Sequence, residues 1–396
     1  MAGSLPDGAL RRLYELDLQI ALGQSLMATQ GWASREVAAA YDRARDLCAH
    51  LDRPPQLIPV LYGQWVNHVN RSEFARAHQF ALEMRQLGED RGDTSIRVMG
   101  GRLRGSTIYC LGRFGTARAV LEQALTLFDP AQRPFYATLS GIDTRVMLLT
   151  FLSRALVALG YLDQGRMMSQ EAIAEARLLS HPFTLGYALL WTVLGAWGVE
   201  PSPMFLQRAE ELRALAREQN FPSLFAGATI YHGWCVAARG EAQEGIAQLT
   251  DGLAGYSATE ANLASPCCLT LLADAYGKAH QPKQGLTQLS EAERLIEVTD
   301  ERWAEAEVHR IRGELLIATD EFDAAETNFR RAAMVAQRQD AKLFELRATT
   351  SLARLWRDQG KREQARDLLA PVYGWFTEGF DTPDLKEAKA MLEALA

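Results

Sequence analysis

The sequence lacks the features that divide a long chain into separate domains. Its 396 residues include 14 prolines and 30 glycines, and no stretch rich in serine, glycine or proline marks a linker. No segment shows the alternation of apolar and polar residues that is typical of a strand. Hydrophobic residues make up 48% of the chain and charged residues 23%, so disorder is not expected. These absences favour one long all-α architecture.

Other absences restrict the partners and the compartment. The formal net charge of −7 leaves no excess of lysine and arginine for phosphate neutralisation, so we expect no nucleic-acid partner. No run of about 18 apolar residues and no apolar leader segment occurs, so we expect no membrane partner. Five cysteines without metal-ligand spacing read as core residues in a reducing compartment. The expected location is the cytoplasm.

Motifs that carry chemistry are also lacking. The chain has no GxxxxGK[ST] loop, no GxGxxG after a strand, no HExxH and no GxSxG. Its seven histidines are scattered without ligand spacing. We therefore expect no cofactor, no metal site and no enzymatic activity. The alternative from another class is an enzyme with an unrecognised site around Trp191, Trp197, His232 and Trp234.

A forty-residue period organises what the chain does contain. The segment "YCLGRFGTARAVLEQALTLFDP" (109–130) has the form of a helix end, a glycine turn and a second helix, and similar segments return further along. The spacing between small residues at the helix crossing is 40, except for one step of 48 and one of 80. The first exception indicates an insertion at 128–144, expected to be a longer loop, and the second a divergent repeat near 205–216. The crossing residues are Ala77, Ala117, Gly165, Gly245, Gly285, Ala325 and Ala365, with Val37 as a poorer first member.

This period predicts a right-handed α-α superhelix, a tetratricopeptide-like solenoid of about nine helical hairpins over residues 1–372, because each hairpin buries its apolar face only against its neighbours. Residues 373–396, "YGWFTEGFDTPDLKEAKAMLEALA", form the predicted C-terminal cap. Trp375, Phe376 and Phe380 are expected to cover the last hairpin. Thr382 is the expected N-cap of a capping helix, with Pro383 at its first position.

The first helix of each hairpin should line the concave wall of the superhelix. The register puts aromatic residues in the middle of this groove and basic residues near its ends, a combination suited to anchoring apolar and anionic groups. Two alternatives stay open: the aromatic residues belong to the core, and the arginines belong to an ion-paired surface, since residues 294–366 hold 14 basic and 14 acidic residues. The candidate groove residues are Arg102, Ser106, Tyr109, Arg154, Tyr187, Trp191, Trp197, Trp234, Asp274, Lys278, Arg310, Glu314, Arg347, Thr350, Arg354 and Arg357.

Three segments, residues 57–90, 271–317 and above all 351–395 with "EGFDTPDLKEAK", resemble the C-terminal tetratricopeptide region of bacterial class III adenylate or guanylate cyclases joined to a STAND-type ATPase. The resemblance implies a sensor or docking arm whose chemistry resides on cyclase or ATPase modules. The sequence therefore predicts a non-catalytic scaffold that binds a protein or peptide segment in its groove, within a bacterial signalling system. The alternative is a receptor for a small molecule or signalling peptide that regulates an associated ATPase, cyclase or transcription regulator.

Overall fold

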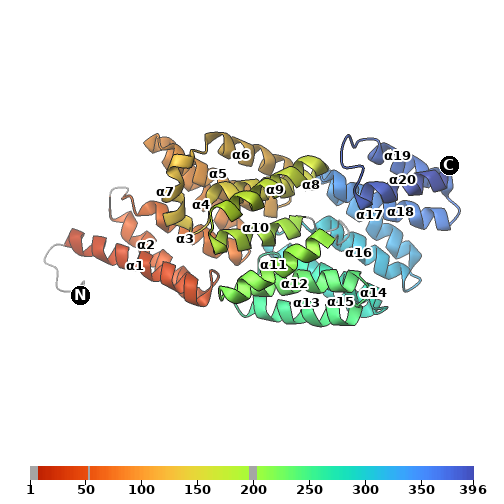
Figure 1. The fold of residues 1–396 in the computed structure, drawn as a ribbon, viewed down its shortest axis with the longest axis horizontal. Helices are drawn as coiled ribbons and strands as arrows, with labels where there is room; N and C mark the ends of the chain where they lie inside the picture. The colour runs from red at the N-terminus through yellow and green to blue at the C-terminus, as the bar shows by residue number, and fades with distance from the viewer. Residues whose placement is uncertain (1–7, 52–53, 196–202) are drawn as a thin grey trace.

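Helices stacked in pairs build most of the described chain. The computed structural model describes residues 8–51, 54–195 and 203–396, and these residues contain helices and no strand. Consecutive helices form antiparallel hairpins that follow one another along a superhelix, with α1 and α20 at opposite ends of the long axis (Figure 1). The paired helices are α1 (Gly8–Gln30) with α2 (Arg35–Ala49), α3 (Leu57–Asn70) with α4 (Phe74–Arg91), α5 (Thr94–Cys110) with α6 (Phe114–Leu127), α8 (Thr144–Ala158) with α9 (Leu162–Leu178), α10 (Pro182–Gly195) with α11 (Pro203–Glu218), α12 (Pro222–Ala238) with α13 (Ala242–Ser257), α14 (Ser265–Lys278) with α15 (Pro282–Thr299), α16 (Glu305–Ile317) with α17 (Phe322–Arg338), and α18 (Lys342–Asp358) with α19 (Arg362–Tyr373).

The backbone repeats with the same period as the sequence. Turns inside the hairpins contain a residue with positive φ, at Ser72, Gly112, Gly160, Gly240, His280, Asp320 and Gly360. Turns between hairpins carry a second row of such residues, at Ser180, Asn220, Glu260, Asp300 and Asp340. Asn220, after α11, lies forty residues from Ser180 and from Glu260. The divergent repeat near 205–216 therefore has the same connecting turn as the other repeats, although its helix lacks their small residue at the crossing.

Close helix crossings explain the small residues of the repeat. An added Cβ at Gly313 would lie 2.4 Å from the ring of Phe329, and one at Gly233 would lie 2.8 Å from the carbonyl oxygen of Gly245. Real side chains do not approach so closely, so a larger residue would push the paired helices apart. The small residues therefore fix the distance between the two helices of a hairpin.

The insertion at residues 128–144 differs from the expected loop. It contains the short 3-10 helix η2 (Pro130–Gln132) and the helix α7 (Arg133–Ser140). The Asp129 side chain accepts a hydrogen bond from the Ala131 backbone at 2.9 Å, and Tyr136 is buried. Pro134 lies in the first turn of α7, where its missing N–H costs nothing. Proline, read in the sequence as a loop signal, thus starts a helix here.

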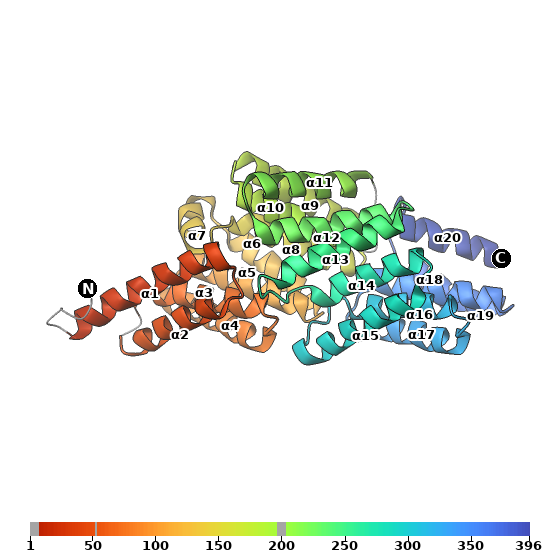
Figure 2. The same ribbon diagram turned by 90° about the horizontal axis from the view of Figure 1, so that it is seen from below.

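Successive turns of the superhelix touch and share backbone hydrogen bonds. The carbonyl oxygen of Asn70 accepts from the N–H groups of Asn262 and Leu263 at 2.8 and 3.2 Å. One hairpin further along, the carbonyl oxygen of Cys110 accepts from Arg302 and Trp303 at 2.9 and 3.3 Å. We call these contacts the seam. The seam thus brings the segments before α14 and α16 against the ends of α3 and α5, and Figure 2 shows α14 next to α5.

The segment 373–396 also joins distant parts of the chain. Phe376 is buried with Leu343 and Leu369, whereas Trp375 and Phe380 are 37% and 50% exposed. The Phe380 ring contacts Tyr373 at the end of α19, with centroids 6.2 Å apart. The helix α20 (Pro383–Leu395) begins after Thr382 as predicted, but the Thr382 hydroxyl donates to the Gly379 carbonyl at 2.6 Å. Within the described ranges, no helix is long and apolar enough to cross a membrane.

Candidate ligand-binding site

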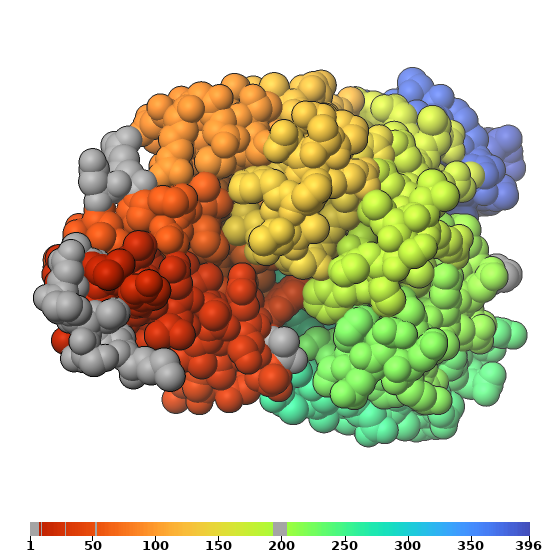
Figure 3. All heavy atoms as spheres, turned by 60° about the vertical axis from the view of Figure 1, so that its left-hand side comes forward, coloured from red at the N-terminus to blue at the C-terminus, as the bar shows by residue number. Residues whose placement is uncertain are grey.

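A large cavity lies between the N-terminal helices and the segments around α12 and α13. Its volume is about 820 Å³, and its walls come from α1, α3, α5, α7, α8, α10 and the start of α12. Residues 258–263, which follow α13 and lead into the seam, complete the wall. Figure 3 shows the molecular surface hollowed where the red N-terminal helices, the yellow segment around α7 and the green segments meet. We call this space the large cavity.

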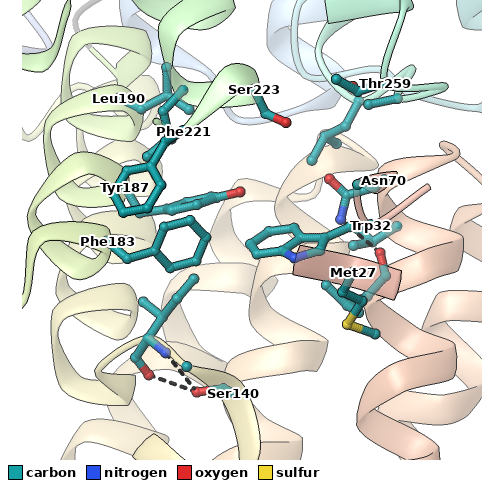
Figure 4. A pocket seen from close by; sticks show the side chains of 18 of the residues that line it. Met27, Trp32, Asn70, Ser140, Phe183, Tyr187, Leu190, Phe221, Ser223 and Thr259 are labelled. Carbon is teal, nitrogen blue, oxygen red and sulfur yellow. Dashed lines mark hydrogen bonds between the residues drawn. The ribbon is translucent and has the colours of Figure 1, made fainter. Parts of the chain in front are cut away.

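Aromatic side chains dominate the walls of the large cavity. The Trp32 ring stacks on Tyr187 with centroids 5.1 Å apart and planes at 20°, and Phe183 meets Trp32 edge-on at 5.7 Å. Trp32 follows α1, whereas the other two rings belong to α10, so the contact crosses the cavity (Figure 4). Phe221, just before α12, packs on Phe183 at 5.1 Å. The cavity therefore offers flat apolar faces from segments that are far apart in the sequence.

Several polar groups of the walls are already fixed by hydrogen bonds. The Trp65 indole N–H donates to the Thr107 hydroxyl at 3.0 Å, and the Tyr62 hydroxyl donates to the Ser140 carbonyl at 3.2 Å. The Ser140 hydroxyl itself bonds to the backbone of Ile142 (Figure 4). The Asn70 side-chain N–H donates to the Val66 carbonyl at 2.7 Å, and the Asn70 backbone carbonyl belongs to the seam. These bonds hold the rings in place before any ligand enters.

Arg102 is the one charged side chain among the described residues that line the large cavity. It is 3% exposed, and its guanidinium carbon lies 5.6 and 5.8 Å from the ring centroids of Tyr62 and Trp65. Its Nη1 atom is buried without a hydrogen-bond partner among the described residues. The cavity thus combines an apolar, aromatic wall with a single positive charge.

The structure gathers some of the predicted groove residues and separates others. Arg102, Ser106, Tyr187 and Trp191 line the large cavity. Tyr109, Arg154 and Trp234 are buried and do not line it. Trp197 lies outside the described residues. The prediction that these side chains bind a ligand is not tested by their placement alone.

Arg154 occupies the centre of a buried aromatic cluster. Its guanidinium carbon lies 4.3 Å from the centroid of Tyr109 and 4.7 Å from those of Trp191 and Trp303. The side chain is 1% exposed, and its three nitrogens have no hydrogen-bond partner among the described residues. Trp303 belongs to the seam, so Arg154 helps to pack two turns of the superhelix together through cation–π contacts.

Three of the predicted groove arginines, Arg310, Arg347 and Arg354, line a second, smaller cavity of about 550 Å³ next to α20. Arg347 pairs with Asp384 at 2.7 Å, and Arg354 pairs with Glu314 at 3.3 Å and with Glu387. Arg310 pairs with Glu307 at 2.8 Å. Because Asp384 and Glu387 belong to α20, the helix predicted as a terminal cap supplies counter-charges to this wall. Thr350 lines the same cavity, and Arg357 pairs with Asp358 outside its lining.

The remaining candidates form local contacts. Lys278 pairs with Asp274 at 2.6 Å, and the Trp234 indole N–H points to Asp274 at 3.3 Å. His232, part of the alternative enzyme site, holds the Gln248 side chain at 2.6 Å. Burial raises the pKa of Cys235 to about 11 and that of Cys268 to about 12, so neither thiol is poised as a nucleophile.

Sequence reasoning missed most of the aromatic wall. Tyr62 stands forty residues before Arg102, so extending the repeat register by one hairpin would have found it. Trp32, Phe183 and Phe221 stand at or beside helix starts and in connections, where the helical register assigns no inner position. Their place in the cavity depends on how distant turns meet.

Comparison with known proteins shows the fold. No family model matches the chain, and no curated protein matches its sequence. A Rap protein complexed with competence and sporulation factor is similar in structure with a TM-score of 0.61 and 10% identity, over 97% of this chain and 100% of that chain. The apo form of the quorum sensor NprR from B. thuringiensis matches with a TM-score of 0.52 and 11% identity, over 92% of this chain and 99% of that one.

A third similar structure is a STAND protein with a tetratricopeptide-repeat sensor from Pyrococcus horikoshii, with a TM-score of 0.44 and 14% identity, over 91% of this chain and 54% of that chain. The expected all-α, tetratricopeptide-like solenoid is confirmed, whereas the link to cyclases is not shown.

Proposed function

We propose that the protein is a signal receptor without catalytic activity of its own, which binds a short peptide in the large cavity. The observation that carries this proposal is the cavity itself. Its volume of about 820 Å³ lies within the range of about 300–1,000 Å³ that is typical of ligand pockets. Aromatic faces suit apolar side chains, and lining residues such as Asn70, Asn220 and Gln30 suit the amide groups of a peptide backbone. The names of the Rap complex and of the quorum sensor support a signalling role.

The seam provides a route from the cavity to the shape of the superhelix. Asn70 and Leu263 both line the large cavity, and they are hydrogen-bonded to each other across the seam. A peptide that contacts both turns stabilises the arrangement in which they touch. Binding then favours the conformation in which the seam is formed, and the size of the shift depends on how much more tightly the peptide binds that conformation.

An ATPase, a cyclase or a transcription regulator is the proposed recipient of this signal. The support is the resemblance of residues 351–395 to the repeat region of cyclase–ATPase proteins. We place the receptor in the cytoplasm, because all five cysteines are buried and unpaired, which is typical of a reducing compartment.

A pair of serine substitutions tests the site. Ser223 lies on the cavity wall in the first turn of α12, whereas Ser290 is an exposed residue of α15 outside the cavity (Figure 4). Peptides captured from a random pentapeptide pool by the wild type should bind Ser223→Trp at least about tenfold more weakly, because the indole occupies their space. Ser290→Trp should bind like the wild type. Fluorescence titration or calorimetry measures these peptide affinities. If Ser223→Trp binds the peptides as tightly as the wild type, the large cavity is not the binding site.

A further inference from the structure

Arg102 presents a buried positive charge with an unsatisfied donor, since its Nη1 atom has no hydrogen-bond partner among the described residues. The rings of Tyr62 and Trp65 interact with the guanidinium through their faces, at 5.6 and 5.8 Å from its carbon. Such contacts do not satisfy the N–H donors, which lie in the guanidinium plane. Both rings donate their own polar hydrogens elsewhere, Tyr62 to the Ser140 carbonyl and Trp65 to Thr107. No described carboxylate pairs with Arg102, and Nη1 lacks any hydrogen-bond partner among the described residues.

Other arginines away from the surface have different surroundings. Arg347, 6% exposed, pairs with Asp384 at 2.7 Å, and the half-buried Arg310 pairs with Glu307 at 2.8 Å. Arg154 lacks hydrogen-bond partners but is surrounded by aromatic rings and does not line the cavity. Arg102 alone among these four combines burial, a missing carboxylate and a place on the cavity wall. Buried charges are ordinarily paired, so the Arg102 guanidinium on the cavity wall is available to an anionic group.

We propose that Arg102 is the anchor for a carboxylate of the ligand. This inference rests on the proposed function, since it names the group by which a peptide is held in the large cavity. The guanidinium fork accepts a carboxylate through two parallel N–H···O bonds. Charge counting favours a monoanion: the described lining contains one positive charge and no negative one. A carboxylate neutralises it, whereas a phosphate dianion would bury an uncompensated negative charge.

The carboxylate can come from the C-terminus of a peptide or from an aspartate or glutamate side chain. Three pools of N-acetylated pentapeptides distinguish these sources when captured by the full-length wild-type protein. The first pool has free C-termini and no acidic residues, the second has the same sequences as C-terminal amides, and the third has amides with one acidic residue. The inference predicts binders in the first or the third pool and none in the second. Binders of equal affinity in the second pool would overturn the inference while leaving the proposed function intact.

Variants of Arg102 supply the second arm. Arg102→Gln keeps hydrogen-bond donors but removes the charge. We expect its affinity for the captured peptides to fall by a factor of about 30 or more, because a charged pair is lost. Arg102→Lys should rescue part of the affinity, because the charge returns without the fork. Unchanged affinity of Arg102→Gln would overturn the inference. An absence of binders in every pool would remove the proposed function, and this inference with it.

A measurement on the ligand-free protein separates anchoring from packing. If the charge is kept for a ligand, replacing it by an apolar side chain of similar length relieves the unpaired burial. Arg102→Met should therefore melt at the wild-type temperature or a few degrees above it, while losing the carboxylate-bearing peptides. A lower melting temperature with unchanged peptide affinity would assign Arg102 to packing and overturn the inference.

Discussion

One buried carboxyl group, that of Glu301, lies at the seam. Glu301 is fully buried, and its carboxylate accepts from the Trp303 indole N–H and the Ala264 backbone, both at 2.8 Å, and from the Ser72 hydroxyl at 3.2 Å. These three donors belong to two turns of the superhelix. Burial nevertheless dominates and raises the pKa of Glu301 from 4.5 to about 7. One carboxyl group thus links the seam to the pH of the surroundings.

We expect the stability of the protein to fall as the pH rises from about 4.5 to about 7. In this window the folded protein holds the Glu301 proton and the unfolded chain has lost it, so folding binds a proton and is favoured by acid. The contribution is on the order of 3 kcal/mol. In Glu301→Gln this part of the pH dependence should disappear, since the amide does not titrate and its oxygen can still accept from Trp303 and Ala264. Urea unfolding at pH 5 and at pH 7.5 checks the prediction, and identical pH slopes for the two proteins would contradict it.

Among the elements, the start of α9 depends on a distant side chain. Its N-cap residue, Tyr161, provides no side-chain cap. The Glu378 carboxylate accepts instead from the backbone N–H groups of Asp163 and Gln164, at 2.9 and 3.1 Å. The Asp163 carboxylate in turn accepts from the Gly379 N–H at 3.0 Å. A carboxylate at a helix N-terminus satisfies free N–H groups and interacts with the helix dipole.

Glu378→Ala should lower the free energy of unfolding by about 1–2 kcal/mol, the effect of losing a helix N-cap. Glu210→Ala, at an exposed position of α11, is the matched control and should stay within about 0.5 kcal/mol of the wild type. Chemical denaturation of both variants measures the difference. If the two substitutions cost the same, the contact between the segment 373–396 and α9 does not stabilise the fold.

The helices and their pairing could be predicted from the sequence because they depend on local signals. A small residue every forty positions, Ala325 and Ala365 for example, reports a helix crossing within one hairpin. The helix α7 was not predicted, because proline occurs both in loops and in the first turn of helices. The role of Glu378 could not be predicted, since its partner lies 215 residues away in the sequence. The aromatic wall of the cavity depends on such long-range meetings, and so does the absence of a partner for Arg102.

At the scale of the whole molecule, hairpins that are far apart in the sequence contact one another as well as their neighbours. The seam joins α3 and α5 to the segments before α14 and α16, and the segment 373–396 joins α9 to α18 and α19 (Figure 1). A solenoid with contacts between nearest neighbours alone would fold repeat by repeat. Here distant hairpins stabilise one another, so we expect the chain to unfold with greater cooperativity than a linear repeat array.

Removal of residues 373–396 tests how much these distant contacts stabilise the protein. The deletion uncovers the apolar side chains of Leu343, Leu346 and Leu369 and frees the α9 N-terminus. The shortened protein should melt at a lower temperature and self-associate, because exposed apolar patches promote association. Asp381 pairs with Arg166 of α9 at 2.9 Å. The double variant Glu378→Ala and Asp381→Ala therefore removes side-chain contacts with α9 but keeps the apolar residues that cover the last hairpin. It should therefore lose stability and remain monomeric in light scattering. A shortened protein that stays monomeric with unchanged melting would show that the segment neither covers the last hairpin nor holds the turns together.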